Sequence, residues 1–300
     1  MELLEPRDVL LGRTTHVRRL LPHKVVRTVG AWCFLDHYGP DDIKVTGGMW
    51  VPPHPHTGLQ TVTWLFDGLA RHLDSLGSDQ LIRPGQLNVM TAGHGICHAE
   101  VSPEDAPTHL HGVQLWVALP EAHRETAAPD FAHLPSLPTY ADDGVTVTVM
   151  TGELGGHRSD APAFSPLVGA ELCFEPGARA RLDLRPEWEY AVLAVDGPLT
   201  VAESGVDAHR LAYLGAGRES VEVTSAEGGL AMLLGGEPFG ERLLMWWNFV
   251  ARTHEEIVEQ RADWNAGGID DVPDRFGQVV GFDGDRLLAP PMPNTTLKPR

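Results

Sequence analysis

Two short segments of the chain carry metal-binding side chain types two residues apart. VPPHPHTG contains His54 and His56, and GICHAE contains His98 and Glu100. Side chains two positions apart on an extended strand point to the same side, so each pair can direct two ligands at one point. Three imidazoles and one carboxylate would bind a divalent transition metal and leave positions of an octahedral ion open. We therefore predict a metal site of the catalytic type on these four residues.

Neither pair is decisive alone, because a chain with 15 histidines forms such pairs by chance and a surface turn would explain an isolated HPH. The prolines of VPPHPHTG favour a metal-binding role for the first pair, since they fix the backbone around both imidazoles. His109 and His111 form a third pair, in THLHGVQLW. No carboxylate lies two residues away, so we expect these two histidines to be structural and to hydrogen-bond a neighbouring loop.

The segments around these residues have the pattern of β-strands. Short runs of apolar and β-branched residues cover 59–66, 113–119, 145–150 and 190–195, between Gly, Pro and Asp residues that favour turns. Within the first two runs side chains alternate with the period of two expected of strands. One helix is predicted near residues 253–263, where Thr253 is followed three residues later by Glu256 in the pattern of a capping box. The sequence therefore indicates an all-β protein with one short C-terminal helix.

The length of 300 residues predicts two domains. We place their connection in residues 119–137, which are rich in Pro, Ala and charge. The expected units are an N-terminal metal-binding domain over 1–135, a C-terminal domain over 136–265 and an extended tail over 266–300. WLFDG and VLAVDG resemble one another as apolar runs that end in Asp-Gly, and this indicates two copies of one fold.

Aligning the two Asp-Gly turns places Asp183 and Arg185 at the positions of His54 and His56. A guanidinium would repel a cation, so we expect no metal in the C-terminal domain.

Composition excludes several classes of partner. The 41 acidic and 23 basic residues give a net charge of -18, which opposes direct binding to nucleic acid or anionic lipid. The first residues lack the pattern of a signal peptide, and no apolar stretch is long enough to span a membrane. We expect a cytoplasmic protein that does not bind membranes. If the protein binds a macromolecule, its acidic charge suits a protein partner with a basic patch better than DNA.

Several longer motifs occur in order along the chain. Gly48, His54, His56 and Gln60 follow the spacing of the first cupin motif, with Gln where that motif usually has Glu. HPHTGLQTVTWLFDG, PGQLNVMTAGHGICHAE, LHGVQLWVALP, GEPFGE and WWNFVARTHEEI together closely resemble the pirin family of bicupin proteins. The resemblance implies two cupin-type antiparallel β-barrels. It also implies one divalent ion, usually iron, on the residues that match here as His54, His56, His98 and Glu100.

Two residues depart from the family pattern. Thr57 stands where many pirins have Arg, and His94 stands where TAGRG is usual. Both flank the expected pocket, so the family's substrate preference does not transfer directly. His94 is expected to be a loop histidine rather than a ligand.

The resemblance implies two alternative functions. One is the ring-opening oxidation of flavonols such as quercetin with O2, in which Glu100 would remove the flavonol proton. The other is non-catalytic, metal-dependent or redox-dependent binding to a protein partner. Fe2+ is the expected ion, although Ni2+, Cu2+, Mn2+, Co2+ and Zn2+ fit the same ligands. Residues expected near the pocket, or in the plain core beside it, are Val62, Trp64, Met90, Gln114 and Trp116.

Overall fold

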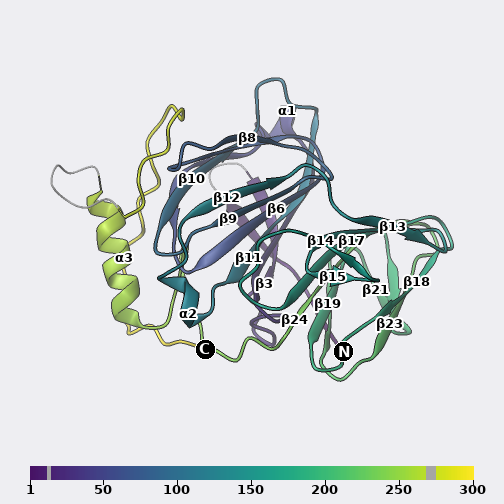
Figure 1. Cartoon of the computed structure of the whole chain (residues 1–300). Helices are drawn as coiled ribbons and strands as arrows, with labels where there is room; N and C mark the ends of the chain where they lie inside the picture. The colour runs from purple at the N-terminus through teal and green to yellow at the C-terminus, as the bar shows by residue number, and fades with distance from the viewer. Residues whose placement is uncertain (12–14, 268–274) are drawn as a thin grey trace.

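The computed structural model describes residues 1–11, 15–267 and 275–300. Two β-rich halves lie side by side, and the C-terminal helix covers the side of the first half that faces away from the second (Figure 1). Each half pairs one seven-stranded with one four-stranded antiparallel sheet. The predicted all-β bicupin fold is confirmed, with one correction: each half is a sandwich of two sheets rather than a closed barrel.

The N-terminal half contains the sheets that position the candidate site. Its large sheet has the order β12 (Asp130–Leu134), β9 (Leu87–Thr91), β6 (Leu59–Asp67), β11 (His109–Ala118), β4 (Trp32–Asp42), β3 (Thr15–Leu21) and β2 (Arg7–Leu11). Its small sheet has the order β5 (Trp50–His56), β10 (Ile96–Val101), β7 (Ala70–Asp74) and β8 (Asp79–Ile82).

The C-terminal half repeats this arrangement. Its large sheet has the order β1 (Glu2–Leu4), β22 (Leu211–Gly215), β19 (Glu189–Asp196), β24 (Gly229–Gly236), β17 (Leu167–Phe174), β14 (Val145–Thr151) and β13 (Thr139–Asp142). Its small sheet has the order β18 (Arg179–Asp183), β23 (Ser220–Thr224), β20 (Leu199–Val201) and β21 (Ser204–Val206). Strand β1 comes from the start of the chain, so this sheet includes a segment that the predicted division at residue 135 assigns to the other domain.

Two hairpins and three helices complete the described part of the chain: β15 (Glu153–Leu154) with β16 (His157–Arg158), β25 (Leu244–Trp246) with β26 (Phe249–Ala251), α1 (Ile43–Thr46), α2 (Glu121–Arg124) and α3 (His254–Ala266). The predicted connection over residues 119–137 contains α2 and β12, and β12 pairs with β9 at the edge of the N-terminal sheet. No helix in the described ranges is long and apolar enough to cross a membrane.

Helix α3 begins where the sequence predicts. Thr253 is its N-cap, and the threonine hydroxyl accepts a hydrogen bond from the Glu256 backbone N–H at 3.2 Å. The second half of the capping box differs, because the Glu256 carboxylate accepts from the Arg252 N–H at 2.9 Å and also pairs with Arg124. The helix therefore ties its first turn to the N-terminal half.

Three of the five apolar clusters among the described residues join the main elements of the fold. One fills the interior of the C-terminal half, and a second lies between the two large sheets and takes residues from both halves, such as Val113 and Leu193. A third lies between the small N-terminal sheet, α3 and the tail, around Phe249, Trp264 and Phe276. Of the tail predicted over 266–300, Ala266 ends α3, residues 275–300 contain no helix or strand, and residues 268–274 lie outside the described residues.

Candidate metal centre

Three neighbouring strands of the small N-terminal sheet direct their polar side chains to one face. In the pairing of β10 with β5, His98 lies opposite His54 and Ile96 lies opposite His56. In the pairing of β10 with β7, His98 lies opposite Asp74 and Glu100 lies opposite His72. Because alternate residues of a strand share a face, the register gathers four histidines and two carboxylates on one side of the sheet.

Strand β5 tolerates its prolines because it lies at the edge of its sheet, where a missing backbone N–H leaves no unmade ladder bond. Gly58, directly after the HPHT segment, has a φ of +68°, and a Cβ there would meet the Val250 carbonyl oxygen at 2.2 Å. Only glycine allows this approach. The close contact brings strand β26 against the end of β5, beside His56.

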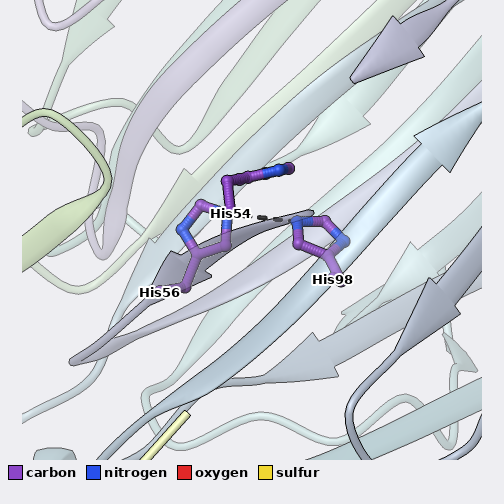
Figure 2. A group of neighbouring side chains, drawn as sticks. All are labelled: His54, His56 and His98. Carbon is purple, nitrogen blue, oxygen red and sulfur yellow. Dashed lines mark hydrogen bonds between the residues drawn. The ribbon is translucent and has the colours of Figure 1, made fainter. Parts of the chain in front are cut away.

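The three predicted histidine ligands converge. One ring nitrogen from each of His54, His56 and His98 lies within 4.8 Å of the others, and all three residues are buried. Figure 2 shows the rings facing a common point, with the Nε2 atoms of His56 and His98 3.1 Å apart.

The outer nitrogens of these rings show which inner nitrogens carry lone pairs. Nδ1 of His54 lies 2.9 Å from the Pro52 carbonyl oxygen, and Nδ1 of His56 lies 3.1 Å from the Asn248 carbonyl oxygen. A carbonyl only accepts, so both Nδ1 atoms donate and both Nε2 atoms are lone-pair acceptors. Nδ1 of His98 faces Nδ1 of His72 at 3.3 Å.

This donor set fits a metal ion. Lone pairs that face one another at about hydrogen-bond distance repel unless a proton or a cation lies between them. Burial also favours the neutral, metal-binding form of each ring. It lowers the pKa of His54 to about 4 and the pKa values of His56 and His98 well below their usual range.

Glu100 lies in the same pocket but is placed differently from the histidines. Its carboxylate is not part of the group of ligand atoms within 4.8 Å of one another. The side chain is 5% exposed, and its Oε1 lies 3.4 Å from the Thr63 hydroxyl, which donates to Gln114 Oε1 at 2.9 Å. Burial raises the pKa of Glu100, against the opposing effects of His72 and Thr63.

His72 and Asp74 belong to the arrangement and were missed by the sequence analysis. Nε2 of His72 lies 3.0 Å from Asp74 Oδ2, and both residues are buried. Burial acts to raise the pKa of Asp74, and hydrogen bonds from His72 and Ser78 outweigh it, so that this pKa is lowered. The signal was present as HLD, a pair with the same two-residue spacing as HPH and HAE.

A pocket of about 390 Å³ opens over the histidine cluster. Phe34 and Trp116 form one wall as a stacked pair with ring centroids 4.0 Å apart. The other lining residues are Val9, Leu10, Arg19, Pro22, Asp36, Val51, His54, His56, His98, Glu100, Gln114, Met245, Trp247, Asn248 and Leu287. The volume lies within the usual range for a small-molecule site.

The remaining residues predicted near this pocket divide between pocket and core. Gln114 and Trp116 line it, and Val62 and Trp64 lie in the core between the two large sheets. Met90 does not line the pocket but lies in the apolar cluster that includes Phe34 and Trp116. The two faces of β6 and β11 explain the division, because one face of each strand points inward and the other packs on the C-terminal half.

The third histidine pair is not bound to a loop, contrary to the prediction. Nε2 of His111 faces Nε2 of His37 on β4 at 2.9 Å, and His109 is exposed.

The two residues that depart from the family pattern, Thr57 and His94, each contact a neighbouring side chain. The Thr57 hydroxyl donates to Gln260 Oε1 at 3.0 Å, and the exposed His94 contacts Glu125 at 2.8 Å, outside the set of pocket-lining residues.

Asp183 and Arg185 lie in the C-terminal half, where the Arg185 guanidinium stacks over the Trp188 ring at 4.7 Å. A metal-free C-terminal half stays a prediction.

The chain matches known protein families over most of its length. Residues 14–117 match the model of the family described as Pirin, and residues 169–270 match that described as Pirin C-terminal cupin domain. A Pseudomonas aeruginosa protein provisionally named a quercetin 2,3-dioxygenase is 44% identical over 98% of this chain and 91% of its own. Human pirin is 33% identical over 71% of this chain and 75% of its own.

Solved structures give the same result. The crystal structure of a quercetin 2,3-dioxygenase from Acinetobacter baumannii has a TM-score of 0.92 and 42% sequence identity to this chain. The match covers 98% of this chain and 96% of that one.

Proposed function

The chain belongs to the pirin family, and from that premise we propose that it is a metal-dependent dioxygenase that opens the ring of flavonols with O2. One observation carries the proposal. Three buried histidines each bring one ring nitrogen to a common point beside a pocket that has an aromatic wall. The names of the Pseudomonas and Acinetobacter relatives support quercetin as the class of substrate.

We propose that His54, His56 and His98 bind the ion and that Glu100 is its fourth ligand. Fe2+ is the proposed resident ion, since imidazole and carboxylate ligands suit it, although intrinsic affinity would favour Ni2+ or Cu2+ at equal supply. The bound ion would supply Lewis acidity at the base of the pocket.

The pocket residues have separate proposed roles. Phe34 and Trp116, stacked on one another, form an aromatic wall against which the flavonol rings pack. Glu100 lies beside the cluster and accepts the proton of the substrate hydroxyl. Apolar residues such as Met245 and Leu287 line the same pocket and exclude water from the reacting atoms.

Aerobic incubation of iron-loaded protein with quercetin tests the proposal. The expected result is loss of the flavonol absorbance with uptake of one O2 per flavonol consumed. Protein carrying His98→Ala should bind less metal and lose activity in proportion. A flat absorbance trace from protein with its metal content confirmed would reject the enzyme and favour a non-catalytic metal-binding role.

A further inference from the structure

His72 and Asp74 lie outside the proposed ligand set. His72 contacts the proposed ligand His98, and Asp74 contacts His72. His72 and Asp74 are 2% and 0% exposed. Nδ1 of His98 faces Nδ1 of His72 at 3.3 Å, and Nε2 of His72 faces Asp74 Oδ2 at 3.0 Å. The series therefore runs from the centre of the site to a buried carboxylate through two imidazole rings.

The carboxylate sets the direction of every hydrogen bond in this series. An ionised carboxylate only accepts, so Nε2 of His72 carries its proton and Nδ1 of His72 is an acceptor. His98 must then donate from Nδ1, which leaves a lone pair on its Nε2. That atom is the one that faces His56 Nε2 at 3.1 Å.

The surroundings hold both partners in place. Phe131 stacks on the His72 ring, with centroids 4.2 Å apart and planes inclined by 13°. The other carboxylate oxygen of Asp74, Oδ1, accepts from the backbone N–H groups of Leu76 and Ser78, each at 2.9 Å. Asp74 is thus anchored at the end of β7, and its Oδ2 faces His72.

We propose that Asp74 and His72 are positioning residues that fix His98 in its Nδ1–H tautomer and so keep its Nε2 lone pair directed at the metal. Such partners of ligating histidines commonly affect metal affinity by about 10- to 100-fold. The inference rests on the proposed function in one respect, since it takes His98 as a metal ligand.

The substitution Asp74→Asn should reverse the direction of the hydrogen bonds between residue 74, His72 and His98 rather than only weaken them. The Leu76 and Ser78 N–H groups need an acceptor, so they keep the amide oxygen of the new residue at the Oδ1 position. Its NH2 group must then face His72 Nε2 and donate to it. His72 becomes a donor from Nδ1, His98 accepts there, and the proton of His98 moves to Nε2, where it blocks metal binding.

A double-mutant cycle separates this effect from damage to the fold. His72→Phe retains an aromatic ring against Phe131 but transmits no hydrogen bond, so adding Asp74→Asn to it should have little further effect on metal affinity. Asp79→Asn is the matched control, because Asp79 lies in the same β7–β8 hairpin and pairs with Arg71 at the surface. It should bind metal as the wild type does.

Two measurements decide the proposal. Zn2+ affinity, measured by competition with a chromophoric chelator, should fall about 10- to 100-fold in the Asp74→Asn protein. Nitrogen-15 NMR of the metal-free proteins should show His98 protonated on Nδ1 in the wild type and on Nε2 in that variant. Thermal unfolding of each variant checks the fold.

Three results would overturn the inference. The first is His98 protonated on Nε2 in the wild type, and the second is unchanged Zn2+ affinity in the Asp74→Asn protein. The third is that Asp74→Asn lowers Zn2+ affinity as much in the His72→Phe protein as in the wild type. Wild-type protein that binds Zn2+ but consumes no flavonol would instead reject the proposed enzyme and leave the positioning role intact. Wild-type protein that binds no metal ion would reject both.

Discussion

The three Nδ1 atoms of the histidine cluster are hydrogen-bonded to three different parts of the chain. The partner of His54 lies in its own strand, that of His56 lies in the turn between β25 and β26, and that of His98 lies in β7. The two carbonyl contacts select the Nδ1–H tautomer of His54 and His56, and the proposed action of Asp74 through His72 selects the same tautomer of His98. The three inner nitrogens are then prepared for a cation before one arrives. Such preorganisation reduces the entropy lost on binding.

Glu100→Gln tests the role of the carboxylate. The amide keeps the size of the side chain but removes its charge and basicity, so the three imidazoles should retain metal, though more weakly. If Glu100 accepts the substrate proton, turnover per bound metal should fall by a factor of about 10² to 10⁴. Metal content and flavonol consumption are measured on the same preparation. Unchanged activity per bound metal would limit Glu100 to ligation.

At the scale of elements, the hairpin of β25 and β26 joins the C-terminal cupin segment to the N-terminal metal site. The Asn248 carbonyl holds His56, and Trp247 lines the pocket with a φ of +52°. That backbone region disfavours residues with a Cβ, and unfavourable conformations of this kind are typical of functional sites. The turn therefore serves both the ligand and the pocket.

Trp247→Gly removes the indole and suits the left-handed backbone. We expect the KM for flavonols to rise roughly 2- to 10-fold, because aromatic contacts contribute about 0.5–1.5 kcal/mol each. The kcat per bound metal should change little. Trp247→Tyr should restore most of the affinity. Steady-state kinetics of both variants is the measurement.

Trp246→Phe is the matched control for Trp247, since Trp246 is half-buried beside Phe249 and is not among the pocket-lining residues. Its KM should equal that of the wild type. Equal KM values for Trp247→Gly and the wild type would remove Trp247 from the substrate wall.

Some of the strands and helices could be predicted from the sequence alone and others could not. Strands β6 and β11 were predicted because their residues alternate, β14 and β19 because they are short apolar and β-branched runs between turn residues, and α3 because of its Thr253 cap. Strand β12 was missed, since its half-buried residues at a sheet edge carry no such alternation.

The same limit applies within the site. Spacing on single strands predicted His54, His56 and His98, which the structure brings together. It did not predict His72 and Asp74, because their role depends on β7 pairing with β10. Pairing between strands far apart in the chain is not encoded in local spacing.

For the whole molecule, the core between the two large sheets joins the halves into one packed unit. Trp32 of the N-terminal half is fully buried there, and its indole N–H lies 3.1 Å from the Val168 carbonyl and 3.2 Å from the Gly235 carbonyl. Beside this core lie His37, His111 and His209, with the His209 ring centroid 5.2 Å from that of His37.

This histidine cluster should make stability depend on pH. Burial, with Arg18 and the other two histidines, lowers the pKa of His37 to about 2, whereas an unfolded histidine titrates near pH 6.5. The unfolded chain therefore binds more protons, and stability present above about pH 6.5 is lost as the pH falls towards the folded pKa. At pH 4.5 this one residue should lower the free energy of unfolding by about 2–3 kcal/mol.

The substitution His37→Gln removes this contribution, so the difference in unfolding free energy between the variant and the wild type should shrink or reverse between pH 7.5 and 4.5. Urea unfolding of metal-free protein measures it. His157→Gln, at an exposed histidine, should leave the pH profile unchanged. A difference between His37→Gln and the wild type that is constant with pH would contradict the prediction.

The first strand of the chain completes a sheet of its second half. In β1, Glu2 pairs with Tyr213 and Leu4 with Leu211, and the Leu4 side chain is buried in the shared core. During synthesis the ribosome releases β1 long before β22, its partner, has been translated. The N-terminal sheets contain no pairing with β1, whereas the large C-terminal sheet is complete only when β1 pairs with β22. The C-terminal cupin unit is therefore not one contiguous segment of the chain, and its large sheet depends on a strand that precedes the N-terminal unit.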